Sequence, residues 1–424
     1  MNAEYSRVGS LPDVVAEHVL ESAFLWEGRA RRVSGVDPQY RLGEIVEHDA
    51  RLSAHLRGLT MADDGAVPHV RRALEEPTPG MVFTSTVFSL LTRRLDLLDH
   101  LVASFGSSQA LRDGVVSAYG WVEPDRLHGL IPSLLQSPDE VRRLLGLATC
   151  AVHRVDPLAS GPWIRDEAAP IRARAMRLAA ELGREELGPT CARAIADEDP
   201  ACRFWAAWSA TLMGNRGVAV QALAEEAMAQ SPERVRALTL TLQTMSVRAA
   251  HDVLQSLARD PKDLRSLIQG SGIVGDPAYV PWLIGHTSDD RTARLAGEAF
   301  SLITGTDLAW LDLEHRPPET FESGPNDDPD DPNVEMDPDE GLPWPDPDKV
   351  KDWWAKNSNR FTPGQRYFMG APVTREHCID ILKNGYQRQR ILAAHYLCLL
   401  EPGTPLFNTS APAWRQQRLL AEMR

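Results

Sequence analysis

The sequence predicts an all-α protein: a solenoid of stacked helix pairs, with an N-terminal helical cap and a C-terminal helical module joined by an acidic linker. Three observations predict this fold. An arginine motif recurs about every 30 residues, helix-type spacing of apolar residues flanks the repeats, and one short segment is strongly acidic. We expect four regions, which are the cap (1–105), the solenoid (106–316), the acidic proline-rich linker (317–348) and the C-terminal module (349–424).

The first 105 residues have the apolar spacing of amphipathic helices. In LPDVVAEHVLESAFLWEGRARRV, that spacing places Val15, Val19, Ala23 and Trp26 on one face. The stretch RLGEIVEHDARLSAHLRGL has a similar face, made of Leu42, Ile45, Leu52, Leu56 and Leu59. The more apolar stretch MVFTSTVFSLLTRRLDLLDHLV predicts a third helix. We expect these helices to cover the open end of the solenoid, because terminal repeats need a cap.

Seven stretches between residues 106 and 316 share one pattern, in which an arginine follows a mostly apolar residue and precedes a small or apolar helical face. The arginines are Arg112, Arg142, Arg172, Arg203, Arg236, Arg265 and Arg294. Turn signals such as SPDE, DEDP and RDPK lie between them. A unit of about 30 residues holds two helices that cannot bury their apolar faces alone, so such units stack on one another.

The repeated pattern resembles the HEAT-like repeats of the bilin-lyase type, whose core reads D-x-x-V-R-x-x-A. The resemblance covers residues 106–316 and implies a HEAT-like α-solenoid. In such repeats the arginine has a structural role, because it pairs with an acid of the next repeat or caps backbone carbonyls. We expect that role here, rather than ligand binding.

The acidic linker and the module after it differ sharply in charge. Residues 317–348 contain 12 acidic residues and no Lys or Arg, and we expect them to be disordered. Asp346 and Pro347 predict the N-cap and first turn of a helix, and a helix pair is expected around Gly385. Since residues 349–424 carry 12 basic and 5 acidic residues, the linker could dock on this module or compete there with an acidic partner.

Composition limits the classes of function. The 424 residues are 43% hydrophobic and 25% charged, as in soluble proteins, and no apolar run is long enough for a membrane helix. The start, MNAEYSRVGS, lacks the apolar core of a signal peptide. The five cysteines form no CxxC motif, which favours buried free thiols in a reducing cytosol. The net charge of −14 argues against general nucleic-acid binding. We expect a cytoplasmic protein with neither membrane nor nucleic-acid partners.

Motifs for catalysis or cofactor binding are absent or lie in the wrong context. GSGIVG at 270–275 has G-x-G-x-x-G spacing, but a helical repeat precedes it where a dinucleotide site needs a strand. No P-loop, G-x-S-x-G or H-E-x-x-H pattern occurs, and DPDDPNVEMDPDE lacks the Gly and Glu of an EF-hand loop. HEAT-like metal hydroxylases carry His-Glu pairs, which this sequence lacks. We predict no catalytic residue, no cofactor and no metal site.

The C-terminal module concentrates aromatic and guanidinium side chains, the types enriched in interface hot spots. We predict a protein-binding surface there, made of Trp353, Trp354, Arg360, Arg366, Tyr367, Arg388 and Arg390. The alternative is that the two tryptophans anchor the core of this module, and we expect at least one of them to do so.

Three motifs are distinctive: AHL (Ala54, His55, Leu56), PGQR at 363–366 and QRQR at 387–390. With these motifs, the chain resembles along its whole length a bacterial family of HEAT-like proteins often encoded with type VI secretion genes. The resemblance implies a cytoplasmic adaptor or chaperone for a secretion effector, and it transfers no catalytic residue.

We therefore expect a non-catalytic scaffold that binds a protein partner, either an effector or toxin or a component of the secretion spike. An immunity protein that neutralises a toxin is the second hypothesis. A lyase or protein-modifying enzyme of the bilin-lyase type is the third, and it would need a pocket with converging polar groups. The sequence does not indicate an oligomeric state.

Overall fold

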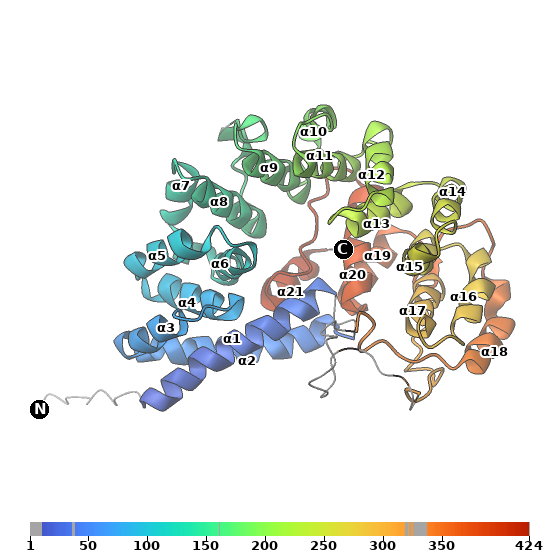
Figure 1. The fold of residues 1–424 in the computed structure, drawn as a ribbon, viewed down its shortest axis with the longest axis horizontal. Helices are drawn as coiled ribbons and strands as arrows, with labels where there is room; N and C mark the ends of the chain where they lie inside the picture. The colour runs from blue at the N-terminus through green and yellow to red at the C-terminus, as the bar shows by residue number, and fades with distance from the viewer. Residues whose placement is uncertain are drawn as a thin grey trace, which may run out of the picture. The chain divides into compact units, whose positions relative to one another are not determined.

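A computed structural model of the chain describes residues 11–35, 39–160, 162–318, 321, 324 and 337–423. The fold is all-α, as predicted, and the strands β1 (Tyr367–Phe368) and β2 (Ala371–Pro372) form one short antiparallel hairpin. The chain packs into two compact units (Figure 1). Their limits differ from the expected boundaries after residues 105, 316 and 348.

Unit 1 contains the chain up to Ser34, then Leu42–Leu178 and Asn408–Glu422. Its helices are α1 (Pro12–Ser34), α2 (Leu42–Ala62), α3 (Val67–Ala73), α4 (Pro79–Thr92), α5 (Leu95–Phe105), α6 (Gln109–Trp121), α7 (Leu130–Leu135), α8 (Glu140–His153), α9 (Ala169–Glu181) up to Leu178, and α21 (Ala413–Glu422).

Unit 2 contains Gly35–Arg41 and Ala179–Phe407, with Met423. Its helices are α10 (Gly188–Ala194), α11 (Pro200–Leu212), α12 (Val218–Met228), α13 (Arg234–Thr244), α14 (Val247–Leu257), α15 (Leu264–Val274), α16 (Val280–His286), α17 (Ala293–Thr304), α18 (Pro347–Asn357), α19 (Arg375–Asn384) and α20 (Gln387–Leu400). Consecutive helices contact one another, as α11 does α12 and α16 does α17, and α15 also packs on α17.

The predicted apolar faces of the first two helices are confirmed, because every residue named for them is buried in α1 or α2. The third predicted helix is wrong as a single element. Arg93 adopts a left-handed conformation (φ 56°) and separates α4 from α5, which packs back on α4. An uninterrupted helix would expose one side of this apolar stretch, whereas the break buries both α4 and the Leu98 face of α5.

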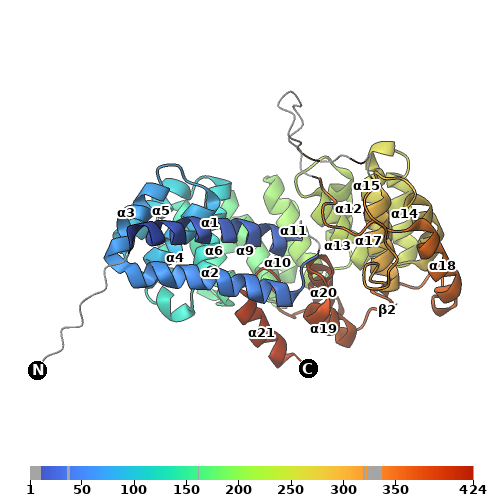
Figure 2. The same cartoon turned by 90° about the horizontal axis from the view of Figure 1, so that it is seen from below.

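The last helix of the chain belongs to unit 1, where α21 lies beside α2 (Figures 1 and 2). A buried ion pair holds its start. Arg29 of α1 donates to Asp49 of α2 over 2.7 Å and also to the carbonyls of Ser410 and Ala411, while Asp49 accepts the backbone N–H of Ala413. Since the extra hydrogen bonds satisfy both charges, this pair joins three helices.

Each of the seven repeat stretches forms one helix, and the predicted structural role of the arginines is confirmed. Arg172 and Arg203 donate to the carbonyls five and six residues before them, at the turn that enters their own helix. In the second repeat Arg143 makes these bonds, while Arg142 pairs with Asp99. These arginines therefore tie α8, α9 and α11 to the turn that precedes each of them.

The last two repeat arginines bind the end of the acidic segment. Arg265 donates twice to the buried carboxylate of Asp339, at 2.7 and 2.8 Å, and Arg294 pairs with Asp337 at 2.7 Å. The predicted disorder is therefore wrong for residues 337–348, because ion pairs and the buried Trp344 hold them. The rest of the segment, apart from 317, 318, 321 and 324, lies outside the described residues. The docking of the linker on the C-terminal module remains a prediction.

The region after the linker packs on the repeats of unit 2. Asp346 caps α18 with Pro347 at its start, as predicted, and α18 contacts α16 (Figure 1). Val350, Phe361 and Tyr367 belong to the same apolar core as Phe300 of α17. The five cysteines are buried and free, and no described helix is long and apolar enough to cross a membrane.

Candidate functional site

Arg366 of the PGQR motif closes the ends of two helices. Its guanidinium donates to the carbonyls of Leu242 (2.7 Å), Gln243 and Met245 (2.8 Å) at the end of α13, and to Val274 (3.1 Å) at the end of α15. Helix ends leave carbonyls without intrahelical partners, so one planar fork satisfies four of them. The structure thus gives Arg366 a packing role.

The aromatic residues predicted for binding contribute to the core of unit 2. Tyr367 is buried, and Trp353 packs edge to face on Phe300 with 5.5 Å between ring centroids. Trp354 contacts Phe361, also at 5.5 Å, and both tryptophans are half-buried. Arg360 is exposed and donates to Asn357. The two tryptophans therefore pack as the alternative hypothesis expected, against the core of unit 2.

The QRQR motif connects the start of α20 to the segment after α1. Arg388 donates to the carbonyl of Gly35, and the backbone N–H of Gln387 donates to that of Tyr40. Arg390 is fully buried, donates to Leu382 and Gln387, and burial lowers its pKa to about 10. These side chains serve contacts within unit 2.

The glycines of GSGIVG are explained by close packing. Gly275 has φ 73°, and a Cβ there would lie 2.0 Å from the carbonyl oxygen of Tyr367. A Cβ on Gly272 would lie 2.8 Å from the backbone of Ala299 in α17. The motif lets a helix and a strand approach α15, and it shows no phosphate-binding geometry.

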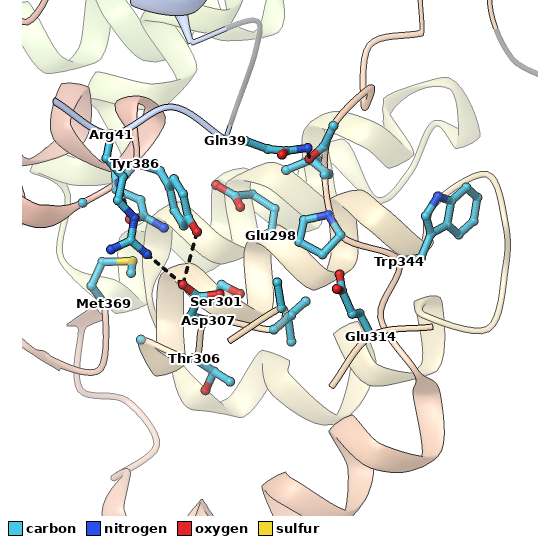
Figure 3. A pocket seen from close by; sticks show the side chains of 18 of the residues that line it. Gln39, Arg41, Glu298, Ser301, Thr306, Asp307, Glu314, Trp344, Met369 and Tyr386 are labelled. Carbon is cyan, nitrogen blue, oxygen red and sulfur yellow. Dashed lines mark hydrogen bonds and ion pairs between the residues drawn. The ribbon is translucent and has the colours of Figure 1, made fainter. Parts of the chain in front are cut away.

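An open cavity of about 750 Å³ lies in unit 2, away from most of the predicted residues (Figure 3). Its walls are the end of α17 and the turns that follow it, residues 341–344, Gln39 with Arg41, and the turn from α19 into α20. No local sequence pattern predicts this site, because its lining residues lie as far apart in the sequence as 39 and 389. Its volume is within the range of ligand pockets.

One wall is a closed group of three side chains. Arg41 donates to Asp307 over 2.8 Å, and the hydroxyl of Tyr386 donates to the same carboxylate oxygen over 3.2 Å. The guanidinium of Arg41 lies 4.3 Å from the centre of the Tyr386 ring. Asp307 also accepts the N–H of Trp310, so its charge is balanced within the wall.

Glu298 of α17 points its carboxylate into the middle of the cavity (Figure 3). No donor or cation among the described residues bonds to it. Burial raises the pKa of Glu298, against the partial opposing effect of Arg388 and with a smaller contribution from Asp339. A half-buried acid without a partner at the centre of a pocket is the feature expected of a ligand-binding group.

The turn after Asp307 presents apolar side chains to solvent. Trp310 is 84% exposed and Leu311 is 45% exposed. Their neighbours Ala309 and Asp312 line the cavity, so the two residues lie at its edge. A pocket of mixed polar and apolar lining with an exposed aromatic residue beside it is an arrangement suited to binding.

The arrangement offers little for covalent chemistry. Among the described residues lining the cavity, the Tyr386 hydroxyl donates to the carboxylate of Asp307, but that carboxylate is already ion-paired with Arg41, which makes it a weak base. Across the described part of the chain, no group of three His, Cys, Asp or Glu side chains is placed to hold a metal.

Comparison with models of protein families, with curated proteins and with solved structures gave no match to this chain. The site is therefore interpreted from its own geometry.

Sequence reasoning missed Glu298, although one signal was present. Glu298 is the only charged residue in the stretch LAGEAF (295–300). The other five residues of this stretch are buried. An acid between buried residues needs a partner or a cavity. Trp310, in contrast, stands in a turn with no pattern that predicts its exposure.

Proposed function

We propose that the protein is a non-catalytic scaffold that binds a protein partner, and that the cavity of unit 2 with Trp310 and Leu311 is the site. The observation that carries the proposal is the exposure of Trp310 beside this pocket. Burying a large apolar side chain is worth about 1.5–3 kcal/mol, and tryptophan is the residue type most enriched in interface hot spots.

The proposed setting is the bacterial cytoplasm, where the protein acts as an adaptor or chaperone for a type VI secretion effector. The resemblance of the AHL, PGQR and QRQR motifs supports this setting. An adaptor contacts both the effector and the secretion spike. An immunity protein, the alternative, contacts a toxin alone and abolishes its activity.

A lyase or protein-modifying enzyme remains the third candidate. The cavity supplies the enclosed space that such an enzyme needs. The one hydroxyl–carboxylate contact described in its lining, Tyr386 with Asp307, is tied up by Arg41, which favours binding over catalysis. An enzyme would change the mass of its partner during incubation, whereas a scaffold would leave that mass unchanged.

The test compares two variants that each remove one exposed side chain. Proteins bound to the tagged wild type in its own cells are identified by mass spectrometry, and the principal partner is then purified for measurement of Kd. We expect Trp310→Ala to weaken binding at least tenfold. The control is Met61→Ala in unit 1, since Met61 is 87% exposed, and it should bind normally. Equal affinity in both variants, or no specific partner, would overturn the proposal.

A further inference from the structure

The charges that line the cavity do not balance. Asp307 is neutralised by Arg41, and Asp312 pairs with Lys349 over 3.2 Å. The carboxylates of Glu298 and Glu314 accept no hydrogen bond from the described part of the chain. Arg388 offsets only part of the effect of burial on Glu298, and Lys349 donates to the backbone carbonyl of Glu314 rather than to its carboxylate. Arg316 also lines the cavity, but it is exposed to water, which screens its charge.

The buried carboxylate is the stronger of the two anions as a binding group. Glu298 lies on the rigid helix α17, and its carboxylate lies in a site from which water is partly removed. Electrostatic attraction grows as the surrounding dielectric falls, so a cation placed there gains more than it would at the surface. Binding such a cation would also relieve the unfavourable burial of the charge.

Aromatic and amide groups around Glu298 suit the same kind of ligand. Tyr386 already holds one guanidinium against its ring, that of Arg41. Gln39 lines the same cavity as Glu298, and its amide donates to the carbonyl of Gly341 (Figure 3). Amide oxygens and aromatic faces both accept cationic donors.

We infer that the cavity binds the cationic side chain of a lysine or arginine on the partner protein, with Glu298 as its counter-charge and Glu314 as a second acceptor. The inference rests on the proposed function, because it names which part of the partner enters the site. Trp310 would then cover an apolar neighbour of that basic residue. The same chemistry would admit a free amine from the cell, and the test separates the two sources.

The test uses N-acetyl-lysine methylamide, N-acetyl-arginine methylamide and the neutral N-acetyl-norleucine methylamide, titrated at pH 7.5 and followed by ligand NMR. We expect saturable binding of at least one cation and none of the norleucine compound. Glu298→Gln should weaken the binding at least tenfold. Glu225→Gln, which removes an exposed carboxylate of α12 in the same unit, should leave it unchanged. Binding that is absent, equal for norleucine, or unaffected by Glu298→Gln would refute the inference.

The affinity for the partner of the proposed function then distinguishes a basic residue of that partner from a free amine as the bound cation. If Glu298→Gln lowers the affinity for the partner as Trp310→Ala does, the basic residue in the cavity belongs to the partner. If cations bind but Glu298→Gln leaves partner affinity unchanged, the cavity serves a free amine, the inference about the partner fails and the scaffold proposal stands.

A second measurement needs no ligand. Because burial raises the folded-state pKa of Glu298 above its ordinary value of 4.5, ionisation of this carboxyl destabilises the folded protein as the pH rises through 4.5 and beyond. Glu298→Gln should therefore raise the urea midpoint at pH 7.5 and leave it unchanged at pH 4. A lower midpoint at pH 7.5 would mean that the carboxylate already has a partner, and would exclude its role as an open counter-charge.

Discussion

Arginine and tryptophan are the residue types that the C-terminal sequence offers most clearly, and they serve two purposes that composition cannot separate. Both are enriched in binding surfaces. Both also close gaps inside a fold, since a guanidinium reaches several carbonyls at once and a large ring fills a core. Arg366 and Arg390 donate inward, to backbone carbonyls and to Gln387. The chain uses them to hold its own backbone.

At this scale, we predict that Arg366→Ala lowers the free energy of unfolding by about 2–4 kcal/mol, because four carbonyls at the ends of α13 and α15 lose their donor. Arg360→Ala should change it by less than about 0.5 kcal/mol, since Arg360 is exposed. Urea unfolding of both variants checks this. A change of similar size in both would show that the fork of Arg366 adds no stability.

Helices and turns show where local pattern is sufficient and where it is not. The 30-residue arginine period marks one helix of every repeat, and in α9 and α11 the arginine bonds to the turn just before its own helix. The break at Arg93 has no such local mark. It depends on α5 finding a surface on α4, which is a tertiary contact.

For elements, two glycines should respond in opposite directions to the same change. Gly275→Ala should destabilise by more than about 1–2 kcal/mol, because an alanine resists φ 73° and its Cβ overlaps the Tyr367 carbonyl. Gly285→Ala lies in the exposed part of α16, where an added Cβ meets nothing within 4 Å, so it should stabilise by about 0.5–1 kcal/mol.

Thermal unfolding of the wild type and the two variants measures this. We expect the melting temperature of the wild type to lie between that of Gly275→Ala and that of Gly285→Ala. If Gly275→Ala were tolerated, the close approach of β1 to α15 would not be needed for stability.

The whole molecule differs from a row of separate domains. The last 76 residues do not form a module of their own, since α21 belongs to unit 1 while α18, α19 and α20 belong to unit 2. Each unit is therefore completed by helices from the end of the chain. Within unit 1, that completion is the bonding of Arg29 and Asp49 to the start of α21.

We therefore predict that a chain ending at Asp348 unfolds at a lower temperature in both units. Unit 1 would lose the groups that satisfy the buried Arg29–Asp49 pair, and leaving such a pair incomplete costs about 3–5 kcal/mol. Circular dichroism melting and hydrogen exchange measure this. Full retention of native protection in α1 and α2, with 349–424 folding by itself, would restore the picture of a tethered module.

The sequence by itself determined the all-α class, the faces of α1 and α2, the helices of the repeats and the cap of α18. Apolar period, turn residues and capping are all read within one or two turns of chain. The tertiary structure alone decided that PGQR and QRQR make contacts inside the fold, that the Glu298 carboxylate faces a cavity, and that this cavity forms between Gln39, Asp307 and Tyr386. Those facts depend on contacts between residues up to several hundred positions apart, which no local pattern encodes.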